Sequence, residues 1–186
     1  MNEPRDDEVL ALQIGRPLRA RSRVLRRCSL HLPIVAEVPP LLDDGEPFPT
    51  RYWLTCPLAH RRIARLEGRG CVRDAQAKLD SDPALAAAVR ETHARYAEER
   101  DAALPAEARY RPSGGVGGSS GSVKCLHAHY ADFAAGNDNP VGRDVAAQIG
   151  EPRCASPCVR FIDGELRRNP DWHEPSQRSS DDAPQH

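Results

Sequence analysis

The spacing of hydrophobic and polar residues predicts a short helix and three strands in the first third of the chain. Residues 7–14 predict a helix, because a glycine and a proline follow them closely. In residues 16–27, arginines at alternating positions predict a first strand. Residues 31–38 and 48–56 are rich in β-favouring residues and predict two further strands. The turn sequence at residues 43–45 lies between these two strands, which therefore form a hairpin with a long loop.

The rest of the chain predicts five helices separated by glycine- and proline-rich segments. Asp82 and Pro83 form a strong helix start, since aspartate caps a helix and proline suits its first turn. A Pro/Gly/Ser-rich loop covers residues 105–121, and Ser122 is the expected cap of the helix that follows. The five helices are expected at about residues 57–67, 72–79, 83–103, 122–135 and 140–149.

These elements predict one α+β domain over residues 7–160. A small, mostly antiparallel sheet in the N-terminal third is covered by the helices that follow it. The length of 186 residues fits a single domain. Residues 1–6 and 161–186 are polar, and we expect a disordered N-terminus and a disordered polar tail.

Charge and hydropathy limit the classes of partner. The formal net charge of −1 gives no overall attraction to nucleic acid or to a membrane surface. The acidic N-terminus lacks the features of a signal peptide, and no apolar run approaches the roughly 20 residues of a membrane span. We expect a cytoplasmic protein without a membrane partner. In that compartment its six cysteines should be reduced and serve as metal ligands, reactive thiols or core residues.

The segment from Gly114 to His129 concentrates groups that bind metals or anions. It contains a glycine-rich loop, a lysine, a thiol and two imidazoles. On a helix, Cys125 and His129 lie four positions apart and share one face, whereas His127 points away. We therefore expect Cys125 and His129 to ligate a metal. His127 is expected nearby, or as an alternative ligand.

Two further ligands would complete a tetrahedral metal site. Cys28 and Cys56 each end a predicted strand, and we expect both to join Cys125 and His129. Three thiolates and one imidazole suit zinc, with iron as the less favoured metal. The alternative is that these cysteines are buried as small hydrophobic residues, as unliganded cysteines often are.

The glycine-rich loop before this pair predicts an anion site. A loop that enters a helix presents backbone N–H groups and the positive end of the helix dipole. The residues expected to bind an anion are Gly117, Gly118, Gly121, Ser122 and Lys124. The sequence does not match a nucleotide-binding phosphate loop, because Gly121 is followed by Ser-Val-Lys. A flexible linker would have the same composition.

Two other chemistries stay open. Cys125 could be a nucleophile whose pKa is lowered by the helix N-terminus, with His129 as its base. The arginines of residues 16–27 could contact an anion or nucleic acid, or form one solvated face of a strand.

Several phrases of the sequence are distinctive: Gln13–Pro17, Arg27–Cys28, Asp44–Pro57, Arg65–Glu67, Val123–Tyr130 and Asn139–Gly142. Together they resemble a bacterial protein family called domain of unknown function 501, and this chain is similar to its actinobacterial members. The resemblance spans about residues 8–160 and implies no activity, because none is assigned to the family. After Cys28 the family pattern has a glycine-bearing turn, whereas this chain has Ser-Leu-His-Leu.

Three classes of function follow from these features. The first, which we favour, is a metal-stabilised binding or regulatory module with a glycine-rich anion-binding loop, for a phosphorylated small molecule or a partner protein. The second is a metal-dependent or cysteine-centred hydrolase of a phosphorylated small molecule. The third is a nucleic-acid contact through residues 16–27. A closed site with four protein ligands would favour the module, and an open coordination position with His127 turned inward would favour the enzyme.

Overall fold

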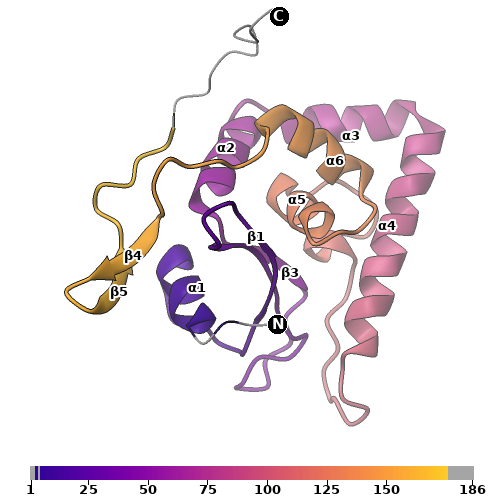
Figure 1. Cartoon of the computed structure of the whole chain (residues 1–186). Coiled ribbons are helices and arrows are strands. Elements are labelled where there is room, and N and C mark those ends of the chain that lie inside the picture. Colours follow the sequence, from indigo (N-terminus) through magenta and orange to yellow (C-terminus); the bar gives the residue numbers. More distant parts are fainter. Residues whose placement is uncertain (1–2, 4, 176–186) are drawn as a thin grey trace, which may run out of the picture.

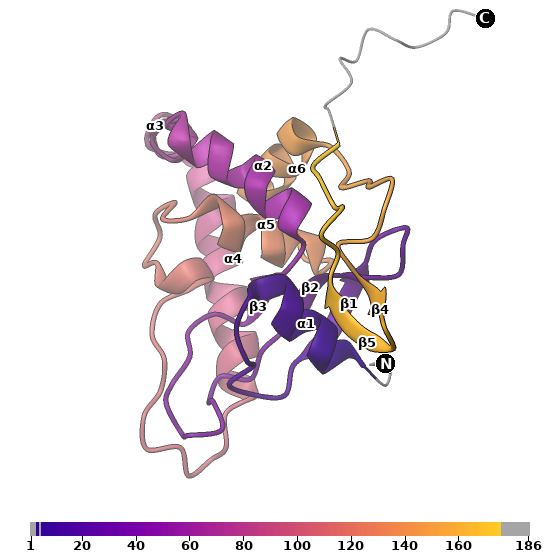
Figure 2. The same cartoon turned by 90° about the vertical axis from the view of Figure 1, so that its left-hand side faces the viewer.

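The three-stranded sheet and the helices pack around a large hydrophobic core, with two smaller clusters of buried hydrophobic residues beside it. The computed structural model describes residue 3 and residues 5–175 (Figures 1 and 2). The described helices are α1 (Asp6–Ile14), α2 (Pro57–Gly68), α3 (Cys71–Ser81), α4 (Pro83–Ala102), the 3₁₀ turn η1 (Val116–Gly118), α5 (Leu126–Ala134) and α6 (Pro140–Ile149). The described strands are β1 (Arg23–Arg27), β2 (Pro33–Glu37), β3 (Tyr52–Leu54), β4 (Val159–Ile162) and β5 (Glu165–Arg168). The predicted α+β class is confirmed.

The first three strands form an antiparallel sheet in the order β1-β2-β3. The antiparallel pairing of β2 with β3 confirms the predicted hairpin of the second and third strands. Strand β2 is the central strand, and four of its five residues are buried. Val35 of β2 pairs with Leu54 of β3, and both side chains face the core. Helix α5 packs against β2 and β3 and lies between the sheet and the long helix α4 (Figure 1). The centre of the core is therefore the contact between α5 and the sheet.

Helices α2, α4 and α5 each bury an apolar face in this core. Leu58 and Ile63 of α2 and Val89 of α4 are fully buried, and Leu126 of α5 is nearly so. Asp82 caps α4 as predicted, because its carboxylate accepts hydrogen bonds from the backbone N–H groups of residues 84 and 85. The sequence pattern therefore located the start of this helix correctly.

The turn after Cys28, between β1 and β2, is where the sequence resemblance leads us to expect a glycine and this chain has none. His31 has a φ of 60°, a left-handed conformation that residues other than glycine seldom adopt. Its N–H donates to the carbonyl of Cys28, and the N–H of Cys28 donates to the carbonyl of Leu32. The turn therefore keeps a geometry suited to glycine, at the cost of backbone strain in His31.

The C-terminal boundary of the folded part differs from the expectation at residue 160. Strands β4 and β5 form an antiparallel hairpin whose two-residue turn is Asp163-Gly164, both with positive φ. The hairpin packs on α1, and the guanidinium of Arg168 donates to the carbonyl of Leu12 at 2.6 Å. Residues 161–175 therefore belong to the described fold. The remainder of the predicted tail, residues 176–186, lies outside the described residues, as do residues 1, 2 and 4 of the predicted disordered N-terminus.

Candidate functional site

Helix α5 begins at Leu126, four residues later than predicted, and this changes which side chains meet. Cys125 precedes the helix with extended backbone angles, φ −154° and ψ 121°. The N–H of Leu126 donates to the carboxylate of Glu67, near the end of α2, at 2.7 Å. Glu67 thus caps α5 from a distant part of the chain, in place of Ser122. Because Cys125 stands outside the helix, the helical spacing from Cys125 to His129 does not apply.

Cys125 meets His127 and Glu67 instead. Nδ1 of His127 lies 3.2 Å from a carboxylate oxygen of Glu67. The ligating atoms of Glu67, Cys125 and His127 lie within 4.8 Å of one another, and this is the one such group of three or more among the described histidine, cysteine and acidic residues. All three side chains are partly buried. Together these side chains could hold a metal ion, and we call them the metal-ligand cluster.

The orientation of His127 is fixed from its other nitrogen. Nε2 donates to the backbone carbonyl of His60 at 3.1 Å, and the two imidazole rings are 4.4 Å apart. Burial lowers the pKa of His127, but its hydrogen bond to the Cys125 thiol and the negative charge of Glu67 outweigh this, and the pKa is raised. Since Nε2 is committed to a carbonyl, Nδ1 is the nitrogen that faces Glu67 and Cys125.

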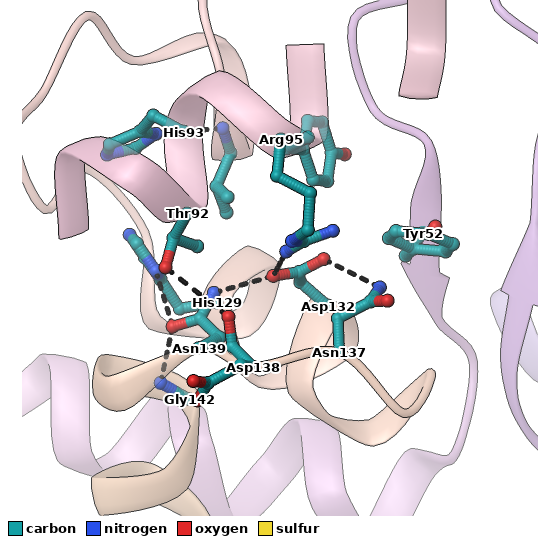
Figure 3. A network of polar contacts seen from close by, with 12 residues as sticks. Tyr52, Thr92, His93, Arg95, His129, Asp132, Asn137, Asp138, Asn139 and Gly142 are labelled. Atoms are coloured by element: carbon teal, nitrogen blue, oxygen red, sulfur yellow. Dashed lines mark hydrogen bonds and ion pairs between the residues drawn. The ribbon is translucent and has the colours of Figure 1, made fainter. Parts of the chain in front are cut away.

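His129 lies in a different, buried network between α4, α5 and α6 (Figure 3). Its Nδ1 lies 3.1 Å from Oδ1 of Asn139, which also accepts from the N–H of Gly142. The side-chain amide of Asn139 donates to Asp132 at 2.9 Å. The expected ligand set Cys28, Cys56, Cys125 and His129 is therefore not brought together in this structure.

Asp132 determines the proton positions in this network. It is fully buried and accepts hydrogen bonds from Arg95 at 2.6 Å and from the side-chain amide of Asn137 at 3.0 Å, so its oxygens are the acceptors of the network. Asn139 must then turn its amide nitrogen toward Asp132 and its oxygen toward His129. Nδ1 of His129 consequently carries the proton, and Nε2 is an acceptor.

The ring of His93 lies beside that of His129 and carries its proton on the other ring nitrogen. The Nδ1 atom of His93 accepts the N–H of Val116 at 3.0 Å, so its proton is on Nε2. The two rings lie 5.6 Å apart, and both Nε2 atoms are buried without a hydrogen-bond partner among the described residues. Burial lowers the pKa of His129 to about 4 and also lowers that of His93. Both histidines are therefore neutral near pH 7.

Cys28 and Cys56 lie at the same end of the sheet, but the side chains near them are not the expected Cys125 and His129. Cys28 follows β1 and Cys56 follows β3, and these strands run in the same direction on either side of β2. Burial raises the pKa of Cys56 to about 12, and the neighbouring thiols of Cys158 and Cys154 add to this increase. Cys28 likewise contributes to the raised pKa values of these two thiols.

These four cysteines form a thiol cluster, made of Cys28, Cys56, Cys154 and Cys158. Gln13 Nε2 lies 3.5 Å from the sulfur of Cys158 and donates to it. Among the residues that the structure describes, no three of these four sulfurs lie within 4.8 Å of one another. The cluster is thus a loose group of neighbouring thiols.

The glycine-rich loop uses many of its amides within the protein. Gly118 donates to a carbonyl of the loop, and Ser122 donates to the hydroxyl of Ser119. The N-terminus of α5 is covered by the carboxylate of Glu67, and Lys124 is exposed. An anion at this helix end would meet a negative charge. Anion binding by Gly117, Gly118, Gly121, Ser122 and Lys124 stays a prediction.

The arginines of residues 16–27 do not form a continuous cationic face. Arg19 pairs with Asp44 and Glu46, and Arg23 pairs with Glu37. Arg27 pairs with Asp6 and Glu3. Because acidic residues neutralise these side chains, the structure gives a nucleic-acid contact here little support.

Comparison with known proteins identifies the family. Residues 24–147, two thirds of the chain, match the model of a family described as protein of unknown function (DUF501), and the chain belongs to this family. No curated protein and no solved structure matches the chain. In the described part of the chain, every helix is too short or too polar to cross a membrane.

Proposed function

We propose that this member of the DUF501 family is a zinc-binding protein whose metal is held by Glu67, Cys125 and His127. The observation that carries the proposal is the convergence of a carboxylate, a thiol and an imidazole within 4.8 Å. These are the three ligand types that zinc takes in proteins. With a thiolate, a carboxylate and a neutral imidazole, the ligands balance the charge of Zn²⁺.

The surroundings of His127 support a metal ligand. A ligating histidine usually donates its second ring N–H to a carbonyl or carboxylate, which fixes the ring and raises its basicity. The bond from Nε2 of His127 to the carbonyl of His60 is of this kind. Glu67 is held in the same way, because one of its oxygens accepts from the N–H of Leu126. Two of the three ligands are therefore oriented before any metal binds.

The same geometry argues against a cysteine-centred hydrolase. In such an enzyme one ring nitrogen of the base faces the thiol alone, and the other is held by an orienting group such as a carboxylate or an amide. Here Nε2 of His127 is occupied by a backbone carbonyl. The thiol of Cys125 and the carboxylate of Glu67 both face the remaining nitrogen. This arrangement suits coordination of one metal ion by all three groups better than proton transfer from the thiol to the imidazole.

Three protein ligands leave a fourth position of a tetrahedral zinc open. An open position is typical of catalytic zinc, whereas structural zinc sites use four protein ligands. The proposal therefore favours a metal-dependent hydrolase over a closed, metal-stabilised module. A water in the open position would be the nucleophile of such an enzyme, with its pKa lowered by the metal.

The first experiment measures zinc in untagged protein and in matched pairs of variants. We expect about one equivalent in the wild type. It should be lost in Cys125→Ser and His127→Ala, and retained in Cys154→Ser and His129→Ala. If zinc were retained in Cys125→Ser and lost in Cys154→Ser, the metal would belong to the thiol cluster and the proposal would be wrong. Absence of metal after reconstitution of reduced protein would also contradict it.

A second measurement tests the open position. Cobalt replaces zinc with the same geometry, and its visible spectrum changes when an exogenous ligand binds. We expect azide to change the spectrum of the cobalt-substituted protein. An unchanged spectrum would indicate a closed site and would support the module instead of the hydrolase.

A further inference from the structure

A groove runs over the start of α2, between α1, β3 and the β4–β5 hairpin. It consists of two adjoining cavities with volumes of about 330 Å³ and about 300 Å³. Gln13, Pro57 and Arg61 line both cavities. Each volume lies in the range of sites that take small molecules. We call this feature the α2 groove.

The charged residues of the α2 groove are all basic. Arg16 and Arg61 line the first cavity, Arg61 and Arg168 line the second, and neither lining contains an aspartate or glutamate. Elsewhere most arginines are paired, but among the described residues neither Arg16 nor Arg61 has a carboxylate within 4.0 Å. The charge of Arg61 acts on the carboxylate of Glu174, but that carboxylate pairs with Arg65 and Arg62. The N–H groups of Arg16 and Arg61 are thus available to an anionic ligand.

Aromatic rings hold two of these guanidinium groups. Arg16 lies over the ring of Trp53 at 4.8 Å, and Arg61 lies over the ring of Trp172 at 4.9 Å. Such cation–π contacts limit the motion of long side chains and leave their N–H groups free to donate. Trp53 and Trp172 are the only tryptophans of the chain, so both indole rings lie in this groove.

The groove also adjoins the metal-ligand cluster. His60 lines the first cavity, and its ring contacts that of His127. The pKa of His60 is lowered by burial and by the neighbouring His127. A ligand bound beside Arg16 and Arg61 would therefore lie one side chain away from the cluster.

We propose that the α2 groove binds a phosphorylated small molecule. Its phosphate lies between Arg16, Arg61 and His60, and its uncharged part covers Pro57 and Trp172. The proposal goes beyond metal binding and does not depend on it, because none of the three metal ligands lines the groove. Binding is expected in metal-free protein as well.

Intrinsic fluorescence tests this directly, since both tryptophans report on the groove. We would titrate EDTA-treated protein with AMP, pyrophosphate and adenosine. AMP and pyrophosphate should change the emission in a saturable way, and adenosine should bind at least tenfold more weakly because it lacks the phosphate. Equal binding of adenosine and AMP would overturn the proposal, as would no binding of either phosphate compound by fluorescence and calorimetry.

Variants locate the phosphate. Arg61→Gln and Arg16→Gln should each weaken AMP binding about tenfold or more, and Arg61→Lys should recover part of the loss. Arg90→Gln is the matched control, because Arg90 is an exposed arginine of α4 that lies outside the groove. An equal loss in Arg90→Gln would indicate unspecific attraction and contradict the proposal. So would an RNA oligonucleotide that displaces AMP and binds more tightly through the same arginines.

The outcomes for the groove and for the metal are separable. AMP binding that persists in His127→Ala and in EDTA-treated protein would support the groove even if zinc proves absent. Zinc bound at one equivalent, without binding of AMP or pyrophosphate, would support the metal proposal and refute the groove. Circular dichroism and the melting temperature of each variant show whether a loss of binding reflects a loss of folding.

Discussion

Nε2 of His127 donates a hydrogen bond to the backbone carbonyl of His60, at 3.1 Å. This contact connects α5 with the first half of α2 and turns Nδ1 of the same ring toward Glu67. The carbonyl belongs to the backbone of α2, so the orientation of His127 does not depend on another flexible side chain. The residue beside the thiol of Cys125 is therefore His127, where helical spacing favoured His129.

The first prediction concerns the buried carboxylate of Asp132. Asp132→Asn removes the carboxylate that pairs with Arg95 and accepts from the side-chain amide of Asn139. The new amide also places an N–H donor next to these two donors. We expect the free energy of unfolding to fall by about 3 kcal/mol or more, since breaking a buried ion pair leaves its partner unpaired. Urea denaturation measures the change.

Asp138→Asn is the matched control. Asp138 lies nearby and pairs with Arg143, but both side chains are largely exposed. We expect a change of less than about 1 kcal/mol, as for other exposed ion pairs. Similar losses of unfolding free energy in both variants would show that the contribution of Asp132 to stability does not depend on its burial.

The second prediction concerns the pH dependence of stability. The pKa of His129 falls from 6.5 to about 4 on folding, so below pH 6.5 the unfolded chain binds a proton that the folded protein refuses. As the pH falls from 6.5 to about 4, the free energy of unfolding should therefore decrease. His129 accounts for at most about 3 kcal/mol of this decrease. Below pH 4 both states are protonated and the contribution is constant.

His129→Gln tests this assignment, because its side-chain amide can donate to Asn139 but does not titrate. The variant should lose the part of the pH dependence that His129 causes. A profile identical in slope to that of the wild type would assign the effect to other groups, of which His93, with its lowered pKa, is the first candidate.

Some of these relationships could be predicted from the sequence, and others depend on contacts that no local pattern contains. The three strands and the cap of α4 follow from alternation, turn residues and Asp82-Pro83. The β4–β5 hairpin also has a local signal that the sequence analysis missed, since Asp-Gly is typical of two-residue hairpin turns. The polar composition of the C-terminal region outweighed that signal.

The site was harder to predict because its partners come from distant segments. Helix α5 begins after Cys125 because Glu67, 59 positions earlier, accepts the N–H of Leu126. That cap decides whether Cys125 faces His127 or His129. Likewise, Cys28 and Cys56 meet Cys154 and Cys158 only because the chain returns to the sheet edge after α6. Spacing along the sequence carries no information on either contact.

The third prediction concerns the strained turn after β1. His31→Gly replaces a residue at φ 60° with one that adopts this conformation without steric cost. We expect the free energy of unfolding to rise by up to about 1 kcal/mol, because the relief of strain exceeds the greater entropy that glycine has in the unfolded chain. Thermal denaturation would show a higher melting temperature. A lower one would mean that the His31 side chain contributes more than its backbone strain costs.

The last prediction concerns the close approach of helices α5 and α6 at Gly142. A Cβ on Gly142 of α6 would lie 2.2 Å from the backbone oxygen of His129 and 2.6 Å from Cβ of Phe133, both in α5. Neither atom is the flexible end of a side chain, so Gly142→Ala must push the helices apart. We expect a loss of about 1–3 kcal/mol in the free energy of unfolding.

Gly68→Ala provides the control for that substitution. Gly68 also lies in a helix, but a Cβ there meets nothing within 4 Å. Alanine should therefore be neutral or stabilise the protein by up to about 1 kcal/mol, as its higher helix propensity predicts. Because Gly142 also positions Asn139 through its N–H, Gly142→Ala should perturb the NMR signals of the His129 ring, whereas Gly68→Ala should not. Equal stability of the two variants would show that α5 and α6 can separate without cost, and that the network around Asp132 does not hold them together.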